Sequence, residues 1–219
     1  MELNNYSEYN YIKGDWFNQF PLGPDRPGER HWIDEAEEAL GGDPNEILYY
    51  FNEWRYRGRI TPGHRVPASF GCSHAMGYGV QTPYAEILEV ANLGWSGFSN
   101  DAIARLVYTY CEEFVPPYII VLWTHPQRRE HIMPDGSLEK FRNQKVPNSW
   151  QEGYFNIQSN KLDRYNYQKN RLFVETYCHA YNIKLIQFDF ADNDQKARDG
   201  VHPGPDWHVA MASKINDQL

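Results

Sequence analysis

Positive charge, cysteine and long apolar runs are all scarce in this sequence of 219 residues. Lysine and arginine number 21 against 29 aspartate and glutamate residues, so the formal net charge at pH 7 is −8. Proteins that bind a phosphate backbone depend on a basic face, and the net negative charge therefore argues against a nucleic-acid partner. No apolar stretch approaches the roughly 18 residues that a membrane-spanning helix needs, so we expect no membrane segment.

The three cysteines, Cys72, Cys111 and Cys178, form no Cys-x-x-Cys pair and leave one thiol over. This pattern favours reduced thiols in a cytoplasm-like compartment. The first residues also lack the basic and apolar regions of a signal peptide. We therefore expect a cytoplasmic location.

The length fits one domain with a sizeable core. Residues 1–60 are expected to form an N-terminal extension packed on that domain. They begin with an irregular arm rich in Asn, Tyr, Pro and Gly, followed by helical pieces over 32–40 and 44–56. Residues 61–219 are expected to form the main domain.

Strand-like and helix-like segments alternate along this main domain. Six apolar residues in a row at 118–123 are typical of a central parallel strand covered on both faces. The alternation predicts an α/β class with a mostly parallel sheet and helices on both faces. The expected strands cover 65–71, 90–95, 118–123 and 183–190, and the expected helices 83–90, 101–114, 160–181 and 205–215.

A connection with little periodicity runs from Thr124 to about Gln158. Connections of this length are often lids or binding loops. Trp150 and Tyr154 lie on it, where aromatic rings can stack on a sugar or simply tether the loop.

A serine stands just past the end of the first expected strand. Residues 68–77 read Ala-Ser-Phe-Gly-Cys-Ser-His-Ala-Met-Gly, with Ser73 directly beyond the apolar run. In α/β proteins, ligand sites lie past the carboxyl ends of the strands, so Ser73 is a candidate nucleophile. A turn or capping role is the alternative, since serine favours both.

Asp199 and His202 stand three residues apart before the last expected helix. At this spacing the carboxylate can hold one imidazole nitrogen while the other acts as a base. A serine hydroxyl needs such a base to become nucleophilic. A solvated pair on a loop is the alternative interpretation, and the presence of Ser73 favours the catalytic one.

Four blocks in this order resemble those of the SGNH (GDSL-type) hydrolases, over about residues 64–217. These are flavodoxin-like α/β enzymes that hydrolyse esters with Ser, Asp and His, so the resemblance implies a three-layer fold with a sheet of four or five strands. The blocks are 70–73 (Phe-Gly-Cys-Ser), 92–97 (Asn-Leu-Gly-Trp-Ser-Gly), 121–126 (Val-Leu-Trp-Thr-His-Pro) and 199–203 (Asp-Gly-Val-His-Pro). The last block is the most specific.

The resemblance also implies a role for each matching residue. Ser73 would be the nucleophile, His202 the base and Asp199 its orienting partner. The oxyanion hole would use the backbone N–H groups of Ser73 and Gly97, with His125 as a third donor.

Two of these blocks depart from the family pattern. Cys72 replaces the usual aspartate of Gly-Asp-Ser, which mainly supports the loop. His125 stands where the family places an asparagine whose amide donates to the oxyanion. A neutral imidazole can donate through one nitrogen, so that role can survive in altered form.

The resulting expectation is a serine esterase that cleaves an acyl or acetyl group, on a carbohydrate or another small ester. It would need no cofactor or metal, and neither nucleic acid nor membrane as partner. The Gly-Cys-Ser and Asp-Gly-x-His-Pro motifs also resemble the branch of the family found in tailed bacteriophages. That branch implies action in a host cytoplasm or on a virion.

Other interpretations stay open. Cys72 could itself be the nucleophile, since a thiol is intrinsically more reactive than a hydroxyl. His202, Asp206 and His208, with Asp199, could form a metal cluster. Arg128 and Arg129 could hold an anionic substrate group or be solvated loop residues. A binding or structural protein that kept the scaffold without the chemistry is the competing class.

Overall fold

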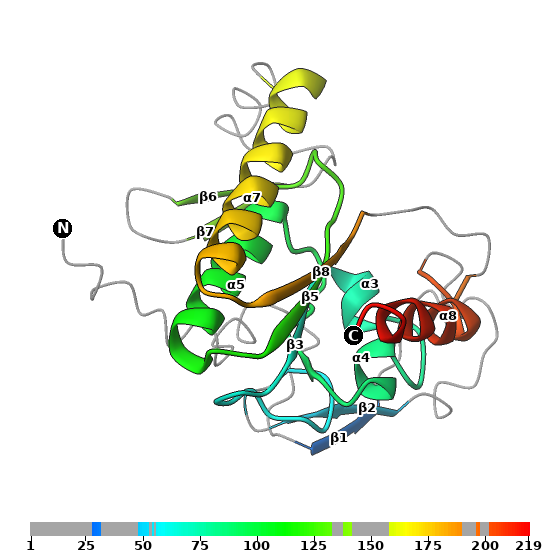
Figure 1. Ribbon diagram of the computed structural model, residues 1–219. Helices are drawn as coiled ribbons and strands as arrows, with labels where there is room; N and C mark the ends of the chain where they lie inside the picture. Colours follow the sequence, from blue (N-terminus) through cyan, green and yellow to red (C-terminus); the bar gives the residue numbers. More distant parts are fainter. Residues whose placement is uncertain are drawn as a thin grey trace.

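In a computed structural model, a parallel sheet lies between two layers of helices (Figure 1). The structure describes residues 52, 54, 56–131, 158–189, 196–197 and 202–219, and the backbone alone of 28–31, 48–51, 132 and 138–141. The predicted α/β class with a mostly parallel sheet is confirmed. In the described part of the chain, no helix is long and apolar enough to cross a membrane.

Among the described residues, the central sheet has four parallel strands in the order β4-β3-β5-β8. In chain order this is 2-1-3-4, which matches the first four strands of the flavodoxin-like order 2-1-3-4-5. The order reverses between β3 and β5, and ligands bind beyond the carboxyl ends of the strands at such a point. The strands are β3 (Ala68–Gly71), β4 (Ala91–Asn92), β5 (Tyr118–Leu122) and β8 (Lys184–Phe188).

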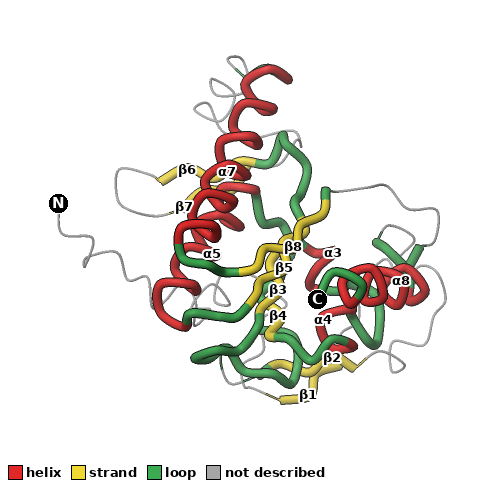
Figure 2. The backbone as a smooth tube through the Cα atoms, viewed as in Figure 1, coloured by secondary structure: helices red, strands yellow, loops and turns green. Residues whose placement is uncertain are grey.

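In the part of the chain that the structure describes, five helices flank this sheet. Helices α5 and α7 cover one face, and α3, α4 and α8 cover the other (Figures 1 and 2). They are α3 (Ser73–Met76), α4 (Tyr84–Ile87), α5 (Asn100–Phe114), α7 (Asn160–Ala180) and α8 (Pro205–Asn216).

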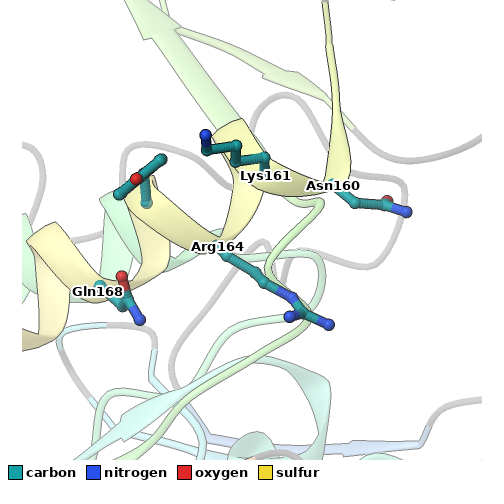
Figure 3. A pocket seen from close by; sticks show the side chains of 5 residues that line it. Asn160, Lys161, Arg164 and Gln168 are labelled. Carbon is teal, nitrogen blue, oxygen red and sulfur yellow. The ribbon is translucent and has the colours of Figure 1, made fainter.

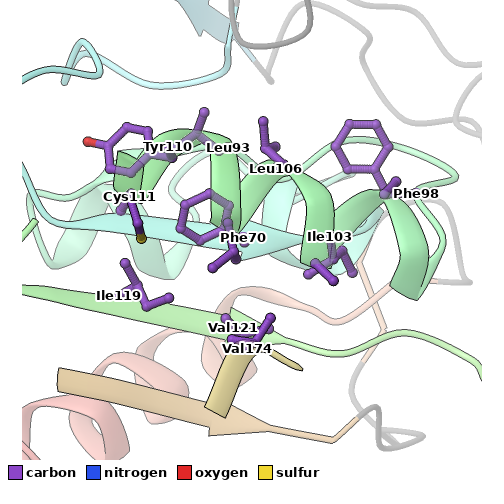
Figure 4. Close-up of a cluster of buried hydrophobic side chains, with 14 of the residues drawn as sticks. Phe70, Leu93, Phe98, Ile103, Leu106, Tyr110, Cys111, Ile119, Val121 and Val174 are labelled. Atoms are coloured by element: carbon purple, nitrogen blue, oxygen red, sulfur yellow. The ribbon is translucent and has the colours of Figure 1, made fainter. Parts of the chain in front are cut away.

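Strand β5 shows how the sequence fills both layers. Ile119 and Val121 point into the cluster under α5 and α7 (Figure 4), whereas Ile120 and Leu122 point to the cluster under α3, α4 and α8. Successive side chains of a strand alternate between faces, so a strand covered on both sides must be apolar throughout. The run of apolar residues therefore makes β5 the central strand.

The two long helices begin at serine caps. The Ser99 hydroxyl accepts a hydrogen bond from the Ala102 N–H, and the Ser159 hydroxyl accepts one from the Leu162 N–H. These caps satisfy backbone donors that the first turn of a helix leaves without a partner. The predicted start of the helix near residue 101 is thus confirmed.

One prediction about the segments outside the sheet is wrong. Residues 48–51, expected within a helix, form strand β2 (Leu48–Phe51), which pairs antiparallel with β1 (Gly28–His31). Their Leu-Tyr-Tyr-Phe sequence is apolar and aromatic, and such residues favour strands when a partner strand is present. The long connection after β5 contains an antiparallel pair, β6 (Arg129–Ile132) and β7 (Leu138–Phe141). The expected helix over 32–40 lies outside the described residues.

Candidate active site

Ser73 lies at the carboxyl edge of the sheet, as the first residue of α3. The chain turns abruptly from β3 into this helix at Gly71. A Cβ at Gly71 would stand 2.5 Å from the Ala75 Cβ and 2.9 Å from the Leu122 carbonyl oxygen, so only glycine fits between helix and strand. This close packing holds Ser73 at the point where the strand order reverses.

The structure brings Ser73 and His202 together. The Oγ of Ser73 lies 2.9 Å from the Nε2 of His202, although 129 positions separate the two residues. Ser73 is buried and His202 is partly buried. This is hydrogen-bonding distance for proton transfer from the hydroxyl to the imidazole.

A short backbone connection fixes the position of His202. Its carbonyl accepts a hydrogen bond of 2.6 Å from the Ala197 N–H, and Lys196 pairs with Pro203 in an isolated antiparallel bridge. Helix α8 begins directly afterwards with Pro205 at its first position, which suits a residue without an N–H. His202 is therefore held between a bridge and a helix start.

Two aromatic rings enclose the imidazole of His202. Tyr78 stacks on it, with ring centroids 4.6 Å apart, and His74 meets it edge-on at 5.4 Å. Burial, together with the nearby charges of His202 and Arg128, lowers the pKa of His74 to about 3. His74 is thus neutral at physiological pH and adds no positive charge beside His202.

Gly97, which the resemblance implies as the second backbone donor of the oxyanion hole, lies in a tight turn after β4. It is buried with φ +80°, in the left-handed region that favours glycine, within a turn closed by the Phe98 N–H and the Trp95 carbonyl. In the described part of the chain, no backbone carbonyl accepts a hydrogen bond from the N–H of Ser73 or Gly97. Donation by these two N–H groups to an oxyanion stays a prediction.

Asn92 connects the second block to the helix that carries Ser73. Its side-chain amide donates to the carbonyls of Ala75 and Met76, and its Oδ1 accepts from the Gly94 N–H. A buried polar side chain is tolerated when its donors and acceptors are satisfied in this way. The contacts of Asn92 are thus structural.

The third block forms a turn beyond β5. Its backbone is held by Asn100, which accepts from the Thr124 N–H and donates to the carbonyls of Thr124 and His125. The Arg128 N–H closes the turn on the His125 carbonyl at 3.1 Å. The side chain of His125 is exposed, and its donation to an oxyanion stays a prediction.

The two neighbouring arginines have different environments. Arg129 is buried and pairs with Asp163 at 3.0 Å, and it also donates to the Leu162 carbonyl. These contacts fasten β6 to α7 and engage the guanidinium of Arg129 within the fold. Arg128 makes no such pair with Asp163 and lies close enough to His74 for its charge to act there.

Two of the alternative interpretations lose their geometric basis. Cys72 is fully buried within the core under α5, where its thiol has apolar neighbours. His208 is also fully buried, and its Nδ1 accepts a hydrogen bond from the Tyr84 N–H. Among the residues that the structure describes, no three His, Cys, Asp or Glu side chains are grouped to hold a metal ion.

Three predicted site residues, Asp199, Trp150 and Tyr154, lie outside the described residues. The structure adds three site-building residues that the sequence analysis missed: Tyr78, Arg57 and Asn100. The guanidinium of Arg57 is buried and donates to the carbonyls of Met76, Gly77, Val80 and Gln81, at and beyond the end of α3. No local sequence pattern marks an arginine for this role, whereas Asn100 at a helix start is a signal that could have been used.

No family model matches the chain, and no curated protein matches it in sequence. Among solved structures, the chain is similar to a GDSL-like lipase from Bacteroides thetaiotaomicron VPI-5482. The match has a TM-score of 0.35 and 14% sequence identity, and covers 73% of this chain and 91% of that one. A likeness at this level carries no argument about activity or about the site.

Proposed function

We propose that this protein is a serine hydrolase of the SGNH type that cleaves acyl esters. The observation that carries the proposal is the 2.9 Å contact between the Ser73 Oγ and the His202 Nε2 at the carboxyl edge of the sheet. Two further observations support it. The Ser73 and Gly97 N–H groups have no backbone acceptor among the described residues, and the His202 imidazole is enclosed by aromatic rings.

The proposed reaction has two halves. The Ser73 Oγ attacks the ester carbonyl while His202 takes its proton, and the tetrahedral intermediate then expels the alcohol, which receives that proton. Water attacks the acyl-enzyme with His202 again acting as base, and releases the acid and free Ser73. Asp199 is proposed to orient His202 and to balance the charge of its imidazolium form.

The negative charge of the intermediate develops on the former carbonyl oxygen. Preorganised N–H donors from Ser73 and Gly97 would stabilise it without having to reorient. His125 is the proposed third donor. We propose an acyl or acetyl group on a carbohydrate or similar small ester as substrate, with a cytoplasmic or phage-related setting as the sequence suggests.

The test is hydrolysis of p-nitrophenyl acetate by the wild type and three variants. Ser73→Ala should abolish hydrolysis, whereas Ser213→Ala, which alters an exposed serine of α8, should not change it. Cys72→Ala should retain hydrolysis if the thiol is not the nucleophile. Equal weak rates from wild type and Ser73→Ala would instead support the non-catalytic scaffold, for which the altered third block is the motivation.

A fluorophosphonate probe tests nucleophile and base together. It should label Ser73 in the wild type, as located by peptide mass analysis, and labelling should be lost in His202→Ala. Labelling that persists in His202→Ala would remove His202 as the base.

A further inference from the structure

Basic side chains gather around the Ser73 site of this otherwise acidic protein. Arg128 and His125 come from the turn beyond β5, and Lys196 comes from the bridge that positions His202. All of them lie close enough to His74 for their charges to oppose its protonation, as does His202 itself. A local excess of positive charge in a cleft raises the concentration of anionic ligands there.

Arg128 differs from the other arginines in this region. Its Nη1 is buried, yet no residue in the described part of the chain accepts a hydrogen bond from it. Arg129 beside it pairs with Asp163, and Arg105 binds Glu130 through both of that residue's carboxylate oxygens. A buried guanidinium nitrogen without an acceptor is costly, so an acceptor supplied by a ligand would stabilise it.

The turn that carries Arg128 lies at the same edge of the sheet as Ser73 and His202. The turn at 125–128 follows β5, and β5 lies next to β3, whose carboxyl end leads to Ser73. The planar guanidinium presents paired N–H donors that match a carboxylate in one plane. Lys196 adds an exposed point charge on the segment that carries His202.

We infer that the ester cleaved at Ser73 carries an anionic oxygen group such as a carboxylate, and that Arg128 binds this group with Lys196 contributing charge. This inference rests on the proposed esterase function and names the class of its substrate. Neutral esters then serve only as poor substrates, because they leave the buried Arg128 nitrogen without an acceptor.

The test uses two pairs of esters that differ in one negative charge. The first pair is 4-acetoxybenzoate and its uncharged methyl ester, in which the carboxylate lies on the alcohol side of the acetyl ester bond. The second pair is mono(4-nitrophenyl) terephthalate and its uncharged methyl ester, in which the carboxylate lies on the acyl side of the nitrophenyl ester bond. The measured quantity is the ratio of kcat/KM for the anionic ester to kcat/KM for its neutral partner, compared between wild type and Arg128→Gln. This comparison cancels the intrinsic reactivity of each ester.

We expect Arg128→Gln to lower this ratio roughly 10- to 100-fold in one of the two pairs, as for the loss of a hydrogen bond between charged groups. The control is Arg164→Gln. Arg164 projects from α7 beside a separate pocket, with a volume of about 480 Å³, that Asn160, Lys161, Tyr165 and Gln168 also line (Figure 3). Arg164→Gln removes the same charge at a place away from the Ser73 site and should leave both ratios unchanged. Ratios that Arg128→Gln leaves unchanged in both pairs would overturn the inference.

A binding measurement separates this inference from the esterase proposal. Saturation-transfer NMR records the binding of 4-acetoxybenzoate to Ser73→Ala and to Ser73→Ala/Arg128→Gln. If the wild type cleaves none of the four esters, binding that is present in the first protein and lost in the second keeps the anion site while the esterase proposal falls. Equal signals from both proteins, or no signal from either, would overturn the anion site itself.

Discussion

Tyr78 lies flat against the imidazole of His202, with ring centroids 4.6 Å apart and an angle of 29° between the rings. The two residues come from different ends of the domain, since Tyr78 follows α3 and His202 precedes α8. An aromatic face attracts a cation placed over it. The ring of Tyr78 is therefore suited to stabilise His202 when it carries the proton of Ser73, as well as to fix the orientation of its imidazole.

Replacing Tyr78 should thus affect turnover. Tyr78→Ala is expected to lower kcat roughly 2- to 30-fold, the rate equivalent of the 0.5–2 kcal/mol of a cation–π contact. Tyr78→Phe keeps the ring and should stay close to the wild type. Steady-state kinetics with p-nitrophenyl acetate measure both, and equal losses in the two variants would assign the effect to the hydroxyl instead.

His125 is predicted to act on the transition state. If its imidazole donates to the oxyanion, His125→Ala should lower kcat by about 10²–10³ with little change in KM, because the interaction exists mainly once charge has developed. His125→Asn restores the amide that the family pattern has at this position and should recover activity. An unchanged kcat in His125→Ala would remove His125 from the mechanism.

His208 should make the protein less stable in weak acid. Burial, with Arg57 and His74 nearby, lowers the pKa of His208 to about 3, and its Nδ1 must stay unprotonated to accept from the Tyr84 N–H. Between its ordinary pKa of 6.5 and about 3, the unfolded chain binds a proton that the folded chain does not. Stability therefore falls as pH falls through this window, by up to about 1.4 kcal/mol per pH unit for each such group.

The measurement is the free energy of unfolding in urea at several pH values between about 5 and 6.5. His208→Asn offers an acceptor that does not titrate. The free energy of unfolding of this variant should therefore depend less steeply on pH than that of the wild type, by an amount that corresponds to at most one bound proton. His64→Asn, at an exposed histidine, is the control and should keep the wild-type slope. His74 has the same kind of lowered pKa, so part of the slope should remain in His208→Asn.

Arg57 should matter for stability far more than its neighbour Arg59. Arg57→Met leaves the buried carbonyl of Val80 without a donor in the described part of the chain, and it removes the charged donor from the carbonyls of Met76 and Gly77, which keep the Asn92 amide and the Val80 N–H. Since an unpaired buried group costs about 1–3 kcal/mol, unfolding in urea should show a loss in that range or above it. Arg59→Met removes an exposed ion pair with Glu86 and should cost less than about 1 kcal/mol. Similar losses from both variants would contradict the structural role of Arg57.

Local patterns were sufficient for the elements of the sheet and its long helices. The apolar run of β5 predicts a strand buried on both faces, and the helix expected over 101–114 matches α5. These features depend on backbone geometry and on near neighbours in the chain. The strand at 48–51 was missed because its apolar residues also fit a helical spacing, and the pairing with residues 28–31 decided between the two.

The sequence by itself determined the α/β class and nominated Ser73 and His202, because motif spacing and strand ends are local properties of a chain, whereas Gly97 was implied by the resemblance to the SGNH hydrolases. Only the tertiary structure decided that the Ser73 Oγ lies within hydrogen-bonding distance of the His202 Nε2 across 129 positions. It also gave the adjacent arginines opposite environments, Arg129 paired with Asp163 and Arg128 with a buried nitrogen that lacks an acceptor among the described residues. Such differences depend on which groups other elements bring near, and a linear pattern does not contain that information.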